Sequence, residues 1–210
     1  GRTVRVQLSE EHCDACRAGM AKMFIKTGNT TKGMQIAEES GGQVCLDCGT
    51  ILESVKQYSD AALMYEKAGS WEKAAGLYIK LKEFRAAAPL MAKISTPKLH
   101  VKYAEAKEKQ KQYREAAESY EKGRDLDSVV RLCLEHLQTP QRAFQIVRET
   151  RSAKGAELVV AYATQQGDTR SAVEFLLVAK EKEKAMELAQ AHDLMDSFAL
   201  FLGEEGTTNE

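Results

Sequence analysis

Residues 58–81 read YSDAALMYEKAGSWEKAAGLYIKL and contain the pattern that decides the fold. A large residue is followed at +3 by a small one, at +7 by a large one and at +10 by a usually small one. At about 100° per residue these offsets fall within an arc of about 80°, so each copy marks one narrow face of an α-helix. The small residue predicts where a neighbouring backbone comes close. The chain contains the copies Tyr58-Ala61-Tyr65-Ala68, Trp71-Ala74-Tyr78-Leu81, Phe84-Ala87-Met91-Ile94 and Tyr113-Ala116-Tyr120-Gly123.

The pattern repeats along the chain. The first three copies begin at residues 58, 71 and 84, and such a step allows about three helical turns and a tight connection. Looser copies keep a small residue at Ala143, Ala156, Ala172 and Ala185. Gly, Asn, Asp, Ser and Pro separate the periodic segments. We therefore expect helices at 10–26, 30–39, 44–56, 58–68, 71–81, 84–93, 98–111, 113–122, 126–136, 140–148, 153–166, 169–179, 182–191 and 193–202.

Helices stacked at a nearly fixed period predict an all-α, right-handed α-solenoid of about seven helical hairpins. A tetratricopeptide repeat takes about 34 residues, whereas each hairpin here takes roughly 26 to 29, so these are tetratricopeptide-like hairpins with shortened helices. We expect the solenoid to occupy 1–202, as a fragment of a longer chain. The stretch 203–210 has no apolar residue to bury, and we expect it to be disordered.

Composition excludes several functions. The chain has 210 residues and 43% apolar residues, enough for a core, while 30 basic and 31 acidic residues leave a net charge of −1. No whole-chain field therefore favours nucleic acid or anionic lipid. The longest apolar runs fall far short of the ~20 residues that cross a bilayer, so we expect no membrane insertion. Five cysteines, an odd number, without a secretory signal favour free thiols.

Two CxxC pairs, Cys13/Cys16 and Cys45/Cys48, have the spacing of a four-cysteine zinc site. Each pair also continues into a helical apolar pattern, where cysteines at i and i+3 share a buried face. The segment between the pairs is itself helical in pattern, unlike a zinc ribbon. We expect four core cysteines and no metal site, with zinc as the alternative.

No arrangement of residues predicts catalysis or cofactor binding. Cys133 and His136 are three apart on one predicted helix, but nothing places an activating partner or an oxyanion-binding turn nearby, so we expect a buried thiol beside a surface imidazole. A carboxylate clamp for peptides needs asparagines on successive first helices, and the chain has only Asn29 and Asn209. We therefore expect no enzyme activity and little support for peptide capture.

Several stretches resemble the WD-repeat-domain-nineteen subunits of intraflagellar transport complex A. They are 48–69, CGTILESVKQYSDAALMYEKAG; 94–104, ISTPKLHVKYA; 112–121, QYREAAESYE; 146–156, IVRETRSAKGA; 188–193, LAQAHD; and 204–210, EEGTTNE. The Tyr-x-x-Ala repeats alone are generic. The Ser-x-Pro-Lys-x-His and Ile-Val-Arg-Glu-Thr segments are not repeat residues, and they make the resemblance specific.

The resemblance implies an interior piece of an α-solenoid in a longer protein that also carries β-propellers. It implies a non-enzymatic scaffold for retrograde ciliary transport, cilium assembly and ciliary entry of membrane proteins, located at the cilium and ciliary base. The implied partners are the other complex A subunits and a tubby-like adaptor. No family binding residue transfers to a position here. The alternatives are a tetratricopeptide peptide-binding adaptor and a vesicle-coat-type scaffold.

Overall fold

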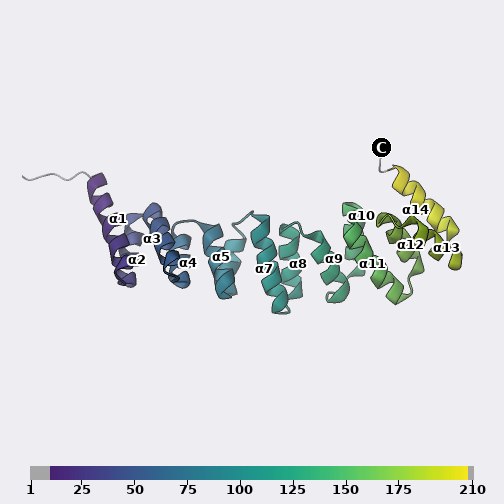
Figure 1. Cartoon of the computed structure of the whole chain (residues 1–210), viewed down its shortest axis with the longest axis horizontal. Coiled ribbons are helices and arrows are strands. Elements are labelled where there is room, and N and C mark those ends of the chain that lie inside the picture. Colours follow the sequence, from purple (N-terminus) through teal and green to yellow (C-terminus); the bar gives the residue numbers. More distant parts are fainter. Residues whose placement is uncertain (1–9, 208–210) are drawn as a thin grey trace, which may run out of the picture. The chain divides into compact units, whose positions relative to one another are not determined.

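The computed structural model describes residues 10–207, with side chains for residues 13–203, and over this range every regular element is a helix (Figure 1). The helices are α1 (Glu10–Lys26), α2 (Thr30–Ser40), α3 (Gly42–Ser54), α4 (Tyr58–Lys67), α5 (Trp71–Leu81), α6 (Phe84–Met91), α7 (Pro97–Lys109), α8 (Tyr113–Lys122), α9 (Leu126–Glu135), α10 (Pro140–Thr150), α11 (Ala153–Gln166), α12 (Thr169–Val178), α13 (Lys182–Ala191) and α14 (Met195–Thr207).

These bounds confirm the all-α prediction, and most helix ends fall within one or two residues of those expected from periodicity. The predicted helix 84–93 ends earlier, at Met91, two residues after Pro89. Proline lacks the N–H that an interior helical position donates, so Pro89 leaves the last turn of α6 with one hydrogen bond fewer. The helix continues through Pro89, and it ends soon afterwards.

The chain divides into two compact units, one ending at Leu99 and the other beginning at His100, so that the boundary lies in the first turn of α7. In the first unit consecutive helices from α1 to α6 pack as neighbours, and α1 also contacts α3. Its core combines small residues with a few large ones. The fully buried large side chains are Leu52, Met64, Tyr65 and Leu90.

In the second unit α8 packs on α9, α9 on both α10 and α11, and α12 on α11, α13 and α14. Its core is a continuous cluster whose fully buried large members are Val129, Val130, Leu132, Val147, Val159 and Phe175. Phe144 lies at the edge of this cluster with its ring centroid 5.1 Å from that of Phe175.

A common backbone device makes the connections short. At the α3–α4 connection, Lys56 adopts a left-handed φ of 65°, and the N–H of Gln57 donates to the carbonyl of Leu52 at 2.9 Å. This Schellman arrangement satisfies the last carbonyls of α3 while Gln57 already serves as the N-cap of α4. One residue therefore ends one helix and begins the next. Left-handed residues stand at the corresponding position of the turns at Gly28, Gly69, Lys82, Lys111, Arg124, Gln138, Arg151, Gly167, Lys180 and Asp193.

The structure differs from the sequence expectation at the end of the last helix. Disorder was expected from residue 203, but α14 continues to Thr207. Extending a formed helix fixes one residue for each new hydrogen bond, so an end without apolar side chains still propagates over another turn. Residues 208–210 of the expected tail lie outside the described residues, and the solenoid boundary at 202 stays a prediction.

Candidate functional site

The structure buries the small residues of the repeated pattern. All eight predicted small residues have 0–1% of their surface exposed, namely Ala61, Ala74, Ala87, Ala116, Ala143, Ala156, Ala172 and Ala185. At the +7 position Tyr65, Tyr78 and Tyr120 are also buried, each at most 4% exposed. The first residue of each of the four clearest copies is half-buried, namely Tyr58, Trp71, Phe84 and Tyr113. Ala68, the +10 residue of the first copy, is also half-buried. Each copy therefore lies along a helix contact, with its first residue at the rim.

Gly49 shows how close such a contact is. A Cβ atom added to Gly49 on α3 would lie 2.8 Å from the Tyr65 ring and 3.4 Å from the Ala61 carbonyl oxygen on α4. At this contact α3 contributes Gly49 and α4 contributes Ala61. Their contribution to stability stays a prediction that mutation tests.

The tyrosines of the pattern also carry a polar interaction that sequence reasoning missed. The Tyr65 hydroxyl donates to Glu53 at 2.6 Å, and the Tyr120 hydroxyl donates to Glu108 at 3.0 Å. Tyr78 makes the same contact with Glu66 at 3.0 Å. Each glutamate lies twelve residues before its tyrosine, on the preceding helix. The ring is buried in the helix contact while its hydroxyl reaches a carboxylate at the surface.

The two cysteine pairs lie in different surroundings. Cys45 and Cys48 are buried, and the Cys45 thiol donates to the Ala37 carbonyl at 3.2 Å. Burial raises the pKa of Cys45 and raises that of Cys48 to about 11, so both remain protonated thiols. Cys16, however, is exposed and Cys13 only half-buried. The expectation that this first pair lies in the core is therefore wrong.

The reason is that periodicity identifies residues that share a helix face, but not whether another helix covers that face. Among the residues described, no three His, Cys, Asp or Glu side chains gather in a way that could hold a metal ion. The structure therefore does not bring the four cysteines together, and the zinc alternative gains no geometric support.

Cys133 and His136 play separate parts in the second unit. Cys133 is fully buried in the core cluster. The His136 ring stacks on Tyr113 with centroids 3.9 Å apart and planes 9° apart. A buried thiol and a stacked imidazole are an arrangement for packing, since a nucleophile must be reached by its substrate.

The described surface has an open groove of about 670 Å³ between α9 and α11. Leu134, Leu158 and Ala161 line its apolar part. Its polar lining consists of Arg131, Glu135, Gln138, Tyr162, Gln165 and Gln166. An amide side chain offers both a donor and an acceptor, which are the groups that an extended polypeptide backbone presents. The groove therefore has the chemistry of a peptide contact.

A second hollow of about 330 Å³ lies beside α7 and α8 and is lined in part by Glu108, Tyr113, Tyr120 and His136. The two hollows share a wall, because Arg131 of the first donates to Glu108 of the second at 2.8 and 2.9 Å. The Arg131 guanidinium, assisted by the Tyr120 hydroxyl, holds the pKa of Glu108 below its ordinary value although burial opposes this. Glu108 is therefore charged and fixed in place.

Sequence reasoning did not identify the groove. Its glutamines stand at the ends of α9 and α11 and follow no motif, and the scarcity of asparagines that could form a clamp argued against peptide capture. The side chains lining the groove come from helices about thirty residues apart, so only the packed structure brings them together. Among the described residues, neither hollow is lined by a serine, threonine or cysteine.

Short helical hairpins with alanine and glycine at their contacts, most of them joined by short turns that contain one left-handed residue, define a tetratricopeptide-like helical repeat domain. The family model that matches residues 20–206 describes the tetratricopeptide (TPR) domain of the intraflagellar transport proteins 140 and 172. This chain belongs to that family. The match confirms the tetratricopeptide-like fold class, while the right-handed sense of the solenoid stays a prediction.

Two curated relatives are similar along nearly the whole chain. WD repeat-containing protein 19 of Homo sapiens is 42% identical over 203 residues, which is 96% of this chain and 15% of that protein. WD repeat-containing protein dyf-2 of Caenorhabditis elegans is 37% identical over 198 residues, 94% of this chain and 14% of that protein. The resemblance seen in the sequence is thereby confirmed. The chain spans about one seventh of the length of these relatives.

Among solved structures, the yeast Tom70 crystal structure is similar with a TM-score of 0.37 and 13% identity, covering 93% of this chain and 47% of that one. Such a TM-score is too low to support any conclusion about binding.

Proposed function

We propose that this chain is a non-enzymatic scaffold segment of intraflagellar transport complex A. In this role it supports retrograde ciliary transport, cilium assembly and ciliary entry of membrane proteins. It acts at the cilium and ciliary base through contacts with the other complex A subunits and with a tubby-like adaptor. The observation that carries the proposal is the 42% identity to WD repeat-containing protein 19 across nearly the whole chain.

The physical basis is a large contact area. Within each unit, packed hairpins expose a surface on which many shallow contacts add up, as stable interfaces of about 1,600 Å² require. Aromatic and arginine side chains commonly anchor such interfaces. Tyr113, Tyr162 and Arg131 line the two hollows of the second unit and are suitable anchors.

The test is a pull-down of each purified complex A subunit with the tagged 210-residue chain, with helicity checked by circular dichroism. The proposal predicts stable capture of at least one subunit. It also predicts weaker capture by a Tyr162→Ala/Gln165→Ala double variant than by a Gln35→Ala/Gln145→Ala variant, which changes two exposed side chains outside the groove. A helical chain that captures no subunit would contradict the proposal, and capture of vesicle-coat subunits instead would favour the coat-type alternative.

A second candidate, a peptide-binding adaptor, is favoured by the three glutamines of the groove. This function predicts micromolar affinity for short extended peptides from partner subunits, measured by fluorescence anisotropy. Loss of that affinity in Gln138→Ala/Gln165→Ala, but not in Gln35→Ala, would support it. Subunit capture without binding of any short peptide would instead support the scaffold alone.

A further inference from the structure

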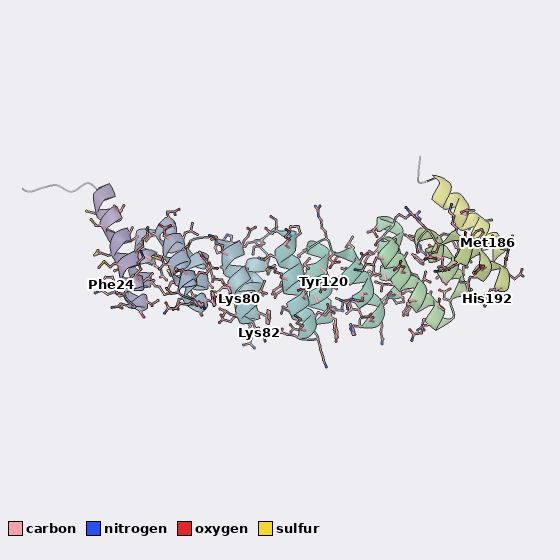
Figure 2. The ribbon with its side chains drawn as sticks, viewed as in Figure 1. Phe24, Lys80, Lys82, Tyr120, Met186 and His192 are labelled. Carbon is pink, nitrogen blue, oxygen red and sulfur yellow. The ribbon has the colours of Figure 1, made fainter. Side chains whose placement is uncertain are left out.

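One edge of the first unit collects basic side chains. The connections α1–α2, α3–α4 and α5–α6 all lie on this edge, at the bottom of the view, where Figure 2 labels Lys80 and Lys82. We call it the lysine edge and define it by six exposed cations at these connections, namely Lys26, Lys32, Lys56, Lys80, Lys82 and Arg85. The acidic residues at the same three connections are Glu53, Asp60 and Glu83, so the lysine edge has an excess of three positive charges.

Contacts between neighbouring hairpins make this edge continuous. The Thr30 hydroxyl at the start of α2 donates to the side-chain oxygen of Gln57 at 3.3 Å, so the first and second connections adjoin. The Lys80 ammonium lies 3.8 Å from the centre of the Tyr58 ring, so the second and third connections adjoin. Lys32 is held in the same way, 4.7 Å from the Phe24 ring. The cations therefore form one row along three hairpins.

Charge pairing distinguishes this edge from the opposite one. At the opposite ends of α2 and α4, Lys67 pairs with Glu38 at 3.6 Å, and one turn before Lys26, Lys22 pairs with Asp47 at 2.6 Å. None of the ion pairs described for this part of the chain involves the six cations of the lysine edge. Their field is therefore not cancelled locally, although the whole chain has a net charge of only −1.

Two apolar side chains stand beside these cations. Met23 in the last turn of α1 is 67% exposed, and Val55 next to Lys56 is 53% exposed. We propose that the lysine edge binds the surface of a membrane containing anionic phospholipid, with Met23 and Val55 entering the headgroup region. This inference does not depend on the proposed function.

A lipid surface fits these features better than a single folded acidic partner. Five of the six cations are lysines, whose compact, strongly hydrated ammonium groups suit a diffuse negative field, whereas arginine suits bidentate recognition of one anion. Lysine and arginine side chains near an anionic membrane surface are attracted to it, and the attraction grows with their number. Exposed apolar side chains add affinity only where the partner has an apolar interior to receive them. The binding is peripheral, since no helix among the described residues is long and apolar enough to span a bilayer.

The test is co-sedimentation of the 210-residue chain with vesicles of phosphatidylcholine alone and of phosphatidylcholine with about 30% phosphatidylserine. The edge variant is Lys26→Glu/Lys56→Glu/Lys82→Glu. None of these three lysines lies over an aromatic ring in the contacts described, unlike Lys32 and Lys80. The control is Lys73→Glu/Lys93→Glu/Lys98→Glu, three exposed cations near the opposite connections, of which Lys73 and Lys93 lie over the rings of Tyr65 and Trp71. The edge variant and the control variant change the net charge of the chain by the same amount. Thermal unfolding checks that both variants remain folded.

The proposal predicts binding only to the anionic vesicles, lost in 0.5 M salt, at least tenfold weaker for the edge variant and changed less than threefold for the control. A Met23→Ser/Val55→Ser variant, with unaltered charge, is expected to bind several-fold more weakly. Equal losses in edge and control variants, or unchanged binding in both, would overturn the proposal. Binding to a polyglutamate peptide without binding to vesicles would overturn it in favour of an acidic polypeptide partner.

Discussion

The Tyr120 hydroxyl donates to the carboxylate of Glu108, twelve residues earlier, at 3.0 Å, and the same carboxylate accepts from Arg131 on the following helix. One carboxylate therefore joins three successive helices, α7, α8 and α9. The equivalent Tyr65–Glu53 and Tyr78–Glu66 pairs join two helices each in the first unit. The repeated pattern thus specifies a polar contact as well as an apolar one.

Replacing Tyr120 with Phe removes only this hydroxyl. We expect a loss of about 0.5–1.5 kcal/mol in the free energy of unfolding, because Glu108 keeps its bond to Arg131 and is not left unpaired. Denaturant unfolding followed by circular dichroism measures it. Tyr162→Phe is the control, since Tyr162 is half-buried and none of the described hydrogen bonds uses its hydroxyl. Equal effects in both variants would show that the Glu108 contact contributes nothing.

Glu108→Gln tests the charge on the same carboxylate. Because Arg131 and Tyr120 lower the folded pKa of Glu108, the stabilisation is present above the ordinary value of 4.5 and is lost as pH falls through the lowered folded pKa. We expect the variant to be about 1–3 kcal/mol less stable at pH 7 and the difference to shrink below pH 4.5. Exposed Glu118→Gln is the control. A difference that does not change with pH would contradict this assignment.

The helices were predictable because periodicity and turn residues act locally. The small residue at +3 also predicted burial correctly at every copy, since a narrow face without bulk lets two helices approach. The twelve-residue Glu–Tyr spacing is present in the sequence, but recognising it requires knowing that the preceding helix runs antiparallel alongside. Exposure of Cys16 depends on whether a helix covers that face of α1, which no local pattern encodes. Sequence reasoning did not identify the lysine edge, because the net charge of −1 sums basic and acidic residues over the whole chain.

The connections offer a backbone test. Lys82 has a left-handed φ of 63°, which costs a non-glycine residue about 1 kcal/mol. We expect Lys82→Gly to raise the free energy of unfolding by up to about 1 kcal/mol, whereas Lys80→Gly, within the last turn of α5, lowers it by at least about 1 kcal/mol because it also removes the contact with the Tyr58 ring. Thermal unfolding of the two variants compares them. A loss of stability in both would show that Lys82 is not left-handed in solution.

Gly49 offers a test of close approach. Gly49→Ala is expected to destabilise by about 1–3 kcal/mol, because the new methyl group would meet the fully buried Tyr65 ring at 2.8 Å. Gly19, in the interior of α1, has no atom within 4 Å of an added Cβ. Gly19→Ala is therefore expected to stabilise by about 0.5–1 kcal/mol through helix propensity alone. Stabilisation by both substitutions would contradict the close contact between α3 and α4.

The most direct test of the repeat register compares Ala87→Leu with Ala88→Leu, adjacent residues of α6 of which the first is fully buried and the second exposed. Both substitutions add the same atoms to the same helix, and denaturant unfolding measures both free energies. The register predicts that Ala87→Leu loses about 1–3 kcal/mol by overpacking and that Ala88→Leu stays within about 0.5 kcal/mol of the unsubstituted chain. Equal stability of the two variants, or a larger loss for Ala88→Leu, would contradict the account of how these hairpins pack.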